Sequence, residues 1–114
     1  MQSYFKDRSF PHNMPGVWGQ HFYDPAHATG QPIIVGEMGG FLTGLNKQWQ
    51  EAFVAFCVSK RIGLFYFCLN PSSVDTGGLV EDDWTTPVRV AHALMCPLVP
   101  AYVSHLTRLH LSTS

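Results

Sequence analysis

The chain has 114 residues, of which 46% are hydrophobic and only 13% are charged, and its formal net charge is −1. This length is sufficient for one domain, and the apolar content excludes a disordered tail or linker. So few charges provide no basic surface for nucleic acid or an anionic membrane, and no apolar run approaches the ~20 residues of a membrane span. We therefore expect no nucleic-acid or membrane partner, and the sequence does not indicate an oligomeric state.

The N-terminal region is predicted to contain an irregular loop and one short helix. Residues 1–13 mix aromatic and charged side chains, and they lack the charged and apolar regions of a signal peptide. Asn13 is expected to cap the helix, with Pro15 in its first turn and Asp24-Pro25 at its end. Its apolar side consists of Val17, Trp18, His21 and Phe22.

A short buried strand that ends in a carboxylate is predicted over Ile33 to Glu37. The Gly39-Gly40 pair follows almost at once and indicates a turn. If Glu37 faces the interior, strict alternation places Val35 on the same face and Ile34 toward the helices.

A long helix and a second strand are predicted next, over residues 46–61 and 64–69. The helix has one apolar face and one polar face. The apolar face contains Trp49, Phe53, Phe56 and Cys57, and the polar face contains Gln48, Gln50, Glu51 and Ser59. The strand is apolar on both faces, with Phe65, Phe67 and Leu69 on one of them, which is typical of a parallel strand covered on both sides.

A last helix is predicted from Thr86-Pro87 to about Cys96. The segment from Ala101 onward has some helical periodicity without clear caps, and it is assigned no role. The order strand, helix, strand predicts a βαβ unit with a right-handed crossover. Because two parallel strands alone leave open edges and uncovered faces, the sequence indicates part of a larger domain.

Three segments together resemble a known enzyme family. They are residues 9–18 (SFPHNMPGVW), residues 33–40 (IIVGEMGG) and residues 70–86 (NPSSVDTGGLVEDDWTT). In this order and at these separations they resemble the C-terminal part of glycoside hydrolase family 5, the cellulase and endoglucanase family, over roughly residues 2–98. The resemblance implies an α/β fold, a C-terminal fragment of a (β/α)₈ TIM barrel with about strands 7 and 8 and their helices. Residues 1–98 are then a partial catalytic domain, and residues 99–114 an unassigned C-terminal tail.

The resemblance also implies a chemistry. Family members are retaining hydrolases of β-glycosidic bonds that use two carboxylates, a nucleophile and an acid/base group. The nucleophile position falls on Glu37. The acid/base glutamate lies in an Asn-Glu-Pro motif that these residues do not contain, and a supporting His-x-Tyr pair is also missing, so the chain alone is expected to be inactive. Members are mostly secreted, which implies an extracellular location and a β-glucan polysaccharide or oligosaccharide substrate.

Four further positions are implied in substrate binding. Phe67 matches a tryptophan that stacks on the sugar, and membership of the core is the lesser alternative for its ring. Tyr4 matches an aromatic platform on the leaving-group side or is an ordinary surface tyrosine. Asn70 and Asp75 could bond sugar hydroxyls or shape turns, and turn shaping is favoured for the segment Asp75-Thr76-Gly77-Gly78.

No metal ion or cofactor is expected. The acidic cluster Glu81–Asp83 lacks the spaced oxygen ligands of a calcium loop, and the histidines show no paired metal spacing. Cys57, Cys68 and Cys96 are interpreted as buried thiols, with a Cys57–Cys68 bridge as a lesser alternative. Trp18 and Trp84 are interpreted as packing residues.

Two functional hypotheses remain from the sequence. In the first, the chain is a piece of a secreted β-glucanase whose activity belongs to the full barrel. In the second, it is a non-catalytic remnant that binds carbohydrate weakly or is only structural.

Overall fold

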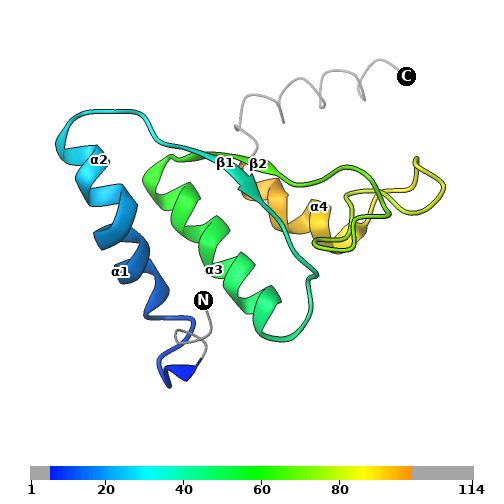
Figure 1. The fold of residues 1–114 in the computed structure, drawn as a ribbon, viewed down its shortest axis with the longest axis horizontal. Coiled ribbons are helices and arrows are strands. Elements are labelled where there is room, and N and C mark those ends of the chain that lie inside the picture. The colour runs from blue at the N-terminus through cyan, green and yellow to red at the C-terminus, as the bar shows by residue number, and fades with distance from the viewer. Residues whose placement is uncertain (1–5, 99–114) are drawn as a thin grey trace, which may run out of the picture.

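The computed structural model describes residues 6–98, and within them one helical layer covers one face of a two-stranded parallel sheet (Figure 1). The C-terminal tail and Tyr4 lie outside the described residues. In chain order the elements are α1 (Met14–Trp18), a π-helical turn (Gly19–Tyr23), α2 (Asp24–Ala28), β1 (Ile34–Met38), α3 (Gly44–Lys60), β2 (Gly63–Tyr66), α4 (Arg89–Met95) and a 3₁₀ turn (Cys96–Leu98).

The first helical segment is longer than predicted. Helical backbone continues through Asp24-Pro25, which was expected to end it, because the π turn gives way directly to α2. The Asp24 N–H donates to the Gly19 carbonyl, and Pro25 then falls in the first turn of α2, where its missing N–H costs nothing. Asn13 precedes α1 but makes no side-chain cap, because its own backbone is already helical, with a φ of −74° and a ψ of −22°.

The strand–helix–strand unit is confirmed. β1 and β2 are parallel neighbours, and α3 connects them. α3 ends at Lys60, followed by Arg61 in a left-handed conformation that closes the helix. Both predicted strands and this helix are present with ends shifted by up to three residues.

β1 contains an extra residue, which overturns the predicted alternation of its side chains. Val35 pairs with Leu64 and Met38 pairs with Tyr66, so three steps along β1 oppose two along β2. Such a bulge reverses the phase of the pleat beyond it. As a result Val35 and Met38 both pack toward the helices, while Ile34 and Glu37 are exposed. The expectation that Val35 shares a face with Glu37 was therefore wrong.

The core lies between the sheet and the helices and is rich in aromatic rings. Trp18 of α1 makes edge-on contacts with Trp49 and Phe53 of α3, and Phe56 and Cys57 are buried beside them. The predicted apolar face of α3 is thus confirmed. Gln50 was predicted on the polar face but is fully buried. Its side-chain amide lies directly against Gly40, which shields it from solvent.

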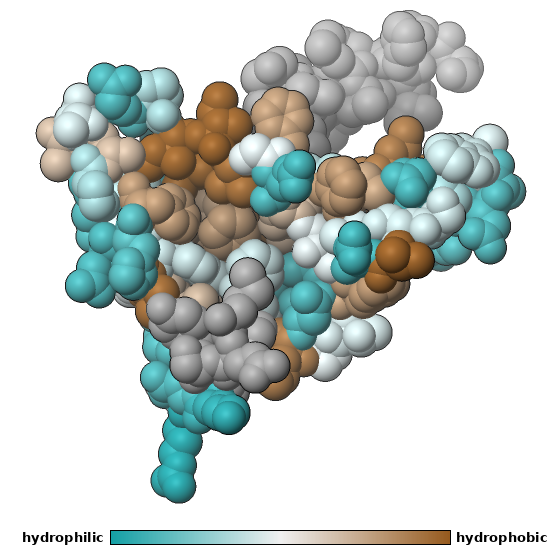
Figure 2. Space-filling view, in the orientation of Figure 1, coloured by the Kyte–Doolittle hydropathy of each residue, from teal (hydrophilic) through white to brown (hydrophobic). Residues whose placement is uncertain are grey.

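The other face of the sheet is uncovered by residues 6–98. Ile34 of β1 is 66% exposed, and Phe65 of β2 is also 66% exposed. Phe65, Phe67 and Leu69, which were predicted to share one face, are all exposed, although β2 itself ends at Tyr66, and Leu64 and Tyr66 pack on the core. Figure 2 shows apolar side chains on the surface where the strands cross the molecule, beside the hydrophilic surface of α2. We call the exposed side chains Ile34, Phe65, Phe67 and Leu69 the open sheet face.

The last helix is shorter than predicted. Thr86 and Pro87 belong to a turn and an isolated bridge with Val80, and α4 begins only at Arg89. Cys57 is buried as predicted, but Cys96 is exposed at the end of α4, and the three cysteines are free. No helix within residues 6–98 is long and apolar enough to cross a membrane.

Candidate functional site

The site is built where β1 and β2 end side by side. Glu37 is the penultimate residue of β1, and its side chain is exposed. The bulge between Val35 and Met38 turns it away from the helices, so the carboxylate is presented beside the open sheet face. Among the described residues, none donates a hydrogen bond to this carboxylate or pairs with it as a cation.

Phe67 is held next to this strand end by the backbone. Its N–H donates a 2.8 Å hydrogen bond to the Met38 carbonyl, which extends the ladder by one residue beyond β2. The Phe67 ring is 45% exposed, so it is not a core residue among those described. The structure therefore places Glu37 and Phe67 at the same end of the sheet.

Gly39 makes this approach possible. A Cβ atom at Gly39 would lie 1.9 Å from the Phe67 carbonyl oxygen, far inside van der Waals contact. Only glycine therefore fits between the two strand ends. The sequence predicted a turn at the glycine pair after Glu37. It did not predict that Gly39 lies against the end of the second strand.

A pair of amide side chains, of which Gln50 is buried and Asn46 is half-buried, supports the turn after Gly39. The Gln50 side-chain N–H donates to the Asn46 side-chain oxygen at 2.6 Å, and a Cβ atom at Gly40 would lie within 3 Å of both side chains. On the other side, the Tyr66 hydroxyl donates to the Gly40 carbonyl at 3.4 Å. Burial raises the pKa of Tyr66, so the hydroxyl keeps its proton. Sequence reasoning missed these groups because Asn46 and Gln50 are polar and resemble solvent-facing helix residues.

The loop after β2 folds back over the strand end. The Leu79 N–H donates to the Cys68 carbonyl at 3.0 Å, and a Cβ atom at Gly78 would lie 2.4 Å from the Asn70 carbonyl oxygen. The turn itself is stabilised by Ser73 and Thr76, whose hydroxyls lie 2.9 Å apart. Asn70 is thereby held near the end of β2.

The segment 75–78 shapes this turn, as favoured from the sequence, through Thr76 and through Gly77 at a φ of 63°, whereas Asp75 contributes no side-chain hydrogen bond in the part of the chain that the structure describes. Its side chain is exposed and makes no hydrogen bond within residues 6–98. Ser73 and Thr76 supply those bonds instead. The carboxylate of Asp75 and the amide of Asn70 are thus without side-chain partners among the described residues.

The acidic segment 81–83 is a turn. Asp83 accepts hydrogen bonds from the Thr86 hydroxyl and from the backbone N–H groups of Thr86 and Thr85, and these bonds lower the pKa of Asp83 to about 2. Residues 6–98 contain no group of three or more potential metal-ligating side chains. Trp84 was predicted to pack, but it is 60% exposed because it lies in this turn with a φ of 59°.

A carboxylate at one parallel strand end, an exposed ring at the next and a glycine-dependent contact between them lie on an α/β unit, and further strands could pair with the open edges of its sheet. No family model matches the chain. Known proteins nevertheless carry the same unit.

The relatives are endoglucanases. The chain is 44% identical over 92 residues to the major extracellular endoglucanase of Xanthomonas campestris pv. campestris, a match that covers 75% of this chain and 18% of that protein. It is 40% identical over 88 residues to an endoglucanase of Paenibacillus polymyxa, covering 75% of this chain and 22% of the relative. The chain therefore spans only about a fifth of the length of these relatives.

Solved structures agree with this similarity. The catalytic domain of the Xanthomonas campestris endoglucanase superposes with a TM-score of 0.76 at 40% identity, over 85% of this chain and 29% of that one. An endocellulase from Pyrococcus horikoshii in complex with cellotetraose superposes with a TM-score of 0.77 at 31% identity, over 85% of this chain and 27% of that one. The resemblance to endoglucanase catalytic domains of glycoside hydrolase family 5 is thus confirmed, and this chain corresponds to little more than a quarter of such a domain.

Proposed function

We propose that this chain is the nucleophile-bearing part of a retaining glycoside hydrolase that cleaves β-glucosidic bonds of cellulose or a related polysaccharide. Glu37 is the nucleophile. The observation that carries the proposal is the placement of Glu37 at the end of β1, turned toward the open side of the sheet by the bulge, next to Phe67 at the end of β2.

The chemistry requires an ionised carboxylate beneath the sugar ring. One Glu37 carboxylate oxygen attacks the anomeric carbon, while a second carboxylic acid at ~5 to 5.5 Å protonates the leaving glycosidic oxygen. Water, deprotonated by that second group, then cleaves the glycosyl ester and releases Glu37. An exposed position at a strand end suits the first role, because the carboxylate is open to substrate.

The second carboxylate is supplied from outside these residues. β1 and β2 correspond to the seventh and eighth barrel strands, and the acid/base glutamate belongs to the fourth. The open sheet face supports this assignment, since Ile34 and Phe65 carry large apolar side chains into space that the first six strands would fill. The chain alone is therefore inactive.

Substrate contacts come from the same edge. The exposed ring of Phe67 offers a CH–π surface to a glucose unit, and the unpartnered side chains of Asn70 and Asp75 are available to its hydroxyls. Tyr4 is proposed as the platform on the leaving-group side. The named relatives support the substrate class, because they are endoglucanases and one solved neighbour is a cellotetraose complex. An extracellular location is proposed on the same ground, since one relative is an extracellular enzyme.

A non-catalytic role is the second candidate, and one observation favours it. Nothing within residues 6–98 orients the Glu37 carboxylate by a hydrogen bond, whereas a nucleophile must be fixed in place. In this case the chain would retain only weak carbohydrate binding through Phe67.

A chimeric barrel separates the two candidates. The segment of the Xanthomonas campestris catalytic domain that superposes on this chain is replaced by residues 6–98, and hydrolysis of a soluble cellulose derivative is measured. We expect turnover, and we expect Glu37→Gln to reduce it by ~10³-fold or more while leaving the circular dichroism spectrum unchanged. Glu51→Gln, on the exposed side of α3, is the matched control and should retain activity. A folded chimera with unchanged activity after Glu37→Gln would refute the proposal.

A further inference from the structure

Gln50 of α3 is a buried polar residue whose presence core packing does not explain. It is 0% exposed, and it is the only buried polar residue within residues 6–98. Its side-chain N–H donates to Asn46, whereas its carbonyl oxygen Oε1 is buried without a hydrogen-bond partner among the described residues. An unpaired buried carbonyl costs stability, and an apolar side chain of the same shape would avoid that cost. Core packing alone therefore does not account for an amide at this position.

The amide of Gln50 contacts the turn that follows Glu37. Together with the Asn46 side chain it lies against Gly40, three residues after the acid. A Cβ atom at Gly40 would be 2.9 Å from Gln50 Nε2 and 2.7 Å from Asn46 Oδ1, so the two amides leave room only for glycine. The 2.6 Å hydrogen bond between the amides joins positions one helical turn apart and holds both in one arrangement. The helix thereby offers the turn a fixed surface.

The second strand holds the same turn. The Phe67 carbonyl lies against Gly39, and the Tyr66 hydroxyl donates to the Gly40 carbonyl at 3.4 Å. The turn is therefore held by α3 and β2 together. Because no side chain within residues 6–98 orients the Glu37 carboxylate by a hydrogen bond, its position relative to these residues depends on the backbone that carries it.

We propose that Gln50 is a positioning residue for the nucleophile, acting through Asn46 and Gly40 on the backbone of Glu37. This inference rests on the proposed role of Glu37. Misplacing a reacting group by ~1 Å can lower the rate of a reaction by ~10²-fold. The ring of Phe67 is held by the backbone of the second strand, so loss of the Gln50 amide leaves this sugar contact in place. The effect therefore falls on kcat and not on KM.

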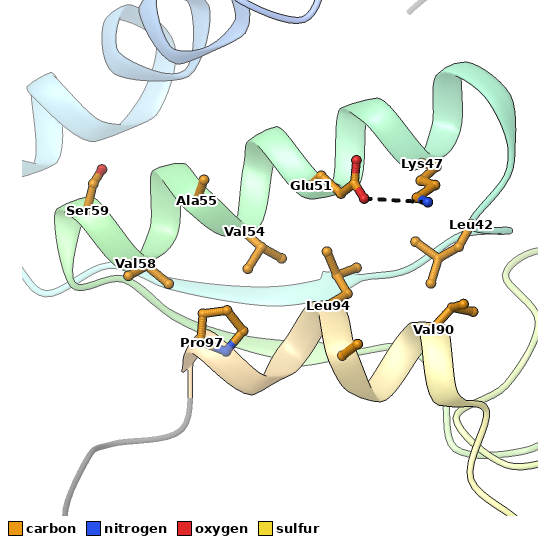
Figure 3. A pocket seen from close by; sticks show the side chains of 11 residues that line it. Leu42, Lys47, Glu51, Val54, Ala55, Val58, Ser59, Val90, Leu94 and Pro97 are labelled. Carbon is orange, nitrogen blue, oxygen red and sulfur yellow. Dashed lines mark ion pairs between the residues drawn. The ribbon is translucent and has the colours of Figure 1, made fainter.

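A second pair of side chains on α3 provides a matched control. Lys47 and Glu51 are also four residues apart and form an ion pair at 3.8 Å, but they line the apolar groove between α3 and α4 (Figure 3). Their side chains are 52% and 54% exposed. Removing this pair changes the same helix at the next positions and leaves the amides against Gly40 in place.

The test compares Gln50→Met with Glu51→Gln in the chimeric barrel. Methionine has nearly the shape of glutamine but no amide, so the free energy of unfolding should stay the same or rise. In this variant kcat on a soluble cellulose derivative should fall at least ~10-fold, with KM within ~2-fold of the parent. The rate of glycosyl-enzyme formation with an activated 2-deoxy-2-fluoro cellobioside should fall by a similar factor. Glu51→Gln should leave all of these quantities within ~2-fold.

Asn46→Ala is measured as well, in case Gln50→Met does not fold. It removes the partner of Gln50 at a half-buried position, and it should lower kcat in the same way with KM unchanged. Unchanged kcat in the folded variants would overturn the inference. A loss of kcat that only follows a loss of stability would also overturn it, because Gln50 would then be structural. Activity that survives Glu37→Gln would instead refute the proposed function, so the two failures are distinguishable.

Discussion

The backbone N–H of Phe67 donates a 2.8 Å hydrogen bond to the carbonyl oxygen of Met38, one residue beyond Glu37. This bond fixes the end of β2 against the end of β1. It brings the acid and the aromatic ring to one edge of the sheet, although they are thirty positions apart in the sequence.

Replacing Gly39 should separate the two strand ends. Gly39→Ala places a Cβ atom 1.9 Å from the Phe67 carbonyl oxygen, so one backbone must move. We expect a loss of about 1–3 kcal/mol in the free energy of unfolding of the chimeric barrel, together with a large loss of activity. Urea unfolding followed by tryptophan fluorescence measures the first effect.

Gly36→Ala is the matched control, because a Cβ atom there has no neighbour within 4 Å. It should change the free energy of unfolding by less than about 0.5 kcal/mol. Equal destabilisation by Gly39→Ala and Gly36→Ala would show that the close contact with Phe67 is not the reason for glycine at position 39.

The open sheet face should make the isolated chain self-associate. Phe65 is 66% exposed on this face, and Phe65→Lys introduces a charge there. We expect the variant to shift the sedimentation profile toward monomer and to reduce binding of an apolar dye. Val74→Lys is the control, since Val74 is 86% exposed but lies in the loop after β2. If Phe65→Lys and Val74→Lys reduced self-association equally, the added charge and not the open sheet face would explain the change.

Stability should fall at alkaline pH because of Cys57. Burial raises the pKa of this thiol from 9.0 to about 11, so the folded state keeps the proton that the unfolded state releases. The stabilisation is fully present below pH 9 and is lost as the pH rises through 11. Urea unfolding of the chimera between pH 8 and pH 11 measures it, and Cys57→Ala should flatten this part of the profile. An unchanged profile in the variant would assign the loss to other groups.

The sequence predicted the helical side of the fold well for a physical reason. Trp49, Phe53 and Phe56 recur at helical spacing because a single buried face requires it, and this periodicity survives in the structure. Gln50 broke the pattern, because the fold buries its amide against Gly40, while its hydrogen-bond partner Asn46 lies one turn earlier on the same helix.

The site was predicted in its residues but not in its geometry. Glu37 and the glycine pair were identified, yet strict alternation gave the wrong companion for Glu37, because it took no account of Gly36, an isolated glycine of the kind that often marks a bulge in a strand. The prediction that Trp84 is a packing residue was also wrong. A single aromatic residue in a polar loop belongs to no helical or strand periodicity from which its burial could be predicted. Long-range relations such as the contact between Gly39 and Phe67 are fixed by strand pairing and leave no local pattern.

The nucleophile assignment is tested most directly by trapping the covalent intermediate. The chimeric barrel is incubated with an activated 2-deoxy-2-fluoro cellobioside, whose fluorine slows hydrolysis of the glycosyl ester so that it accumulates. Intact and peptide mass spectrometry should find one added glycosyl unit, attached at Glu37 and absent after Glu37→Gln. An adduct on another carboxylate, or turnover of natural substrate that persists in the Glu37→Gln variant, would contradict the assignment of Glu37 as nucleophile.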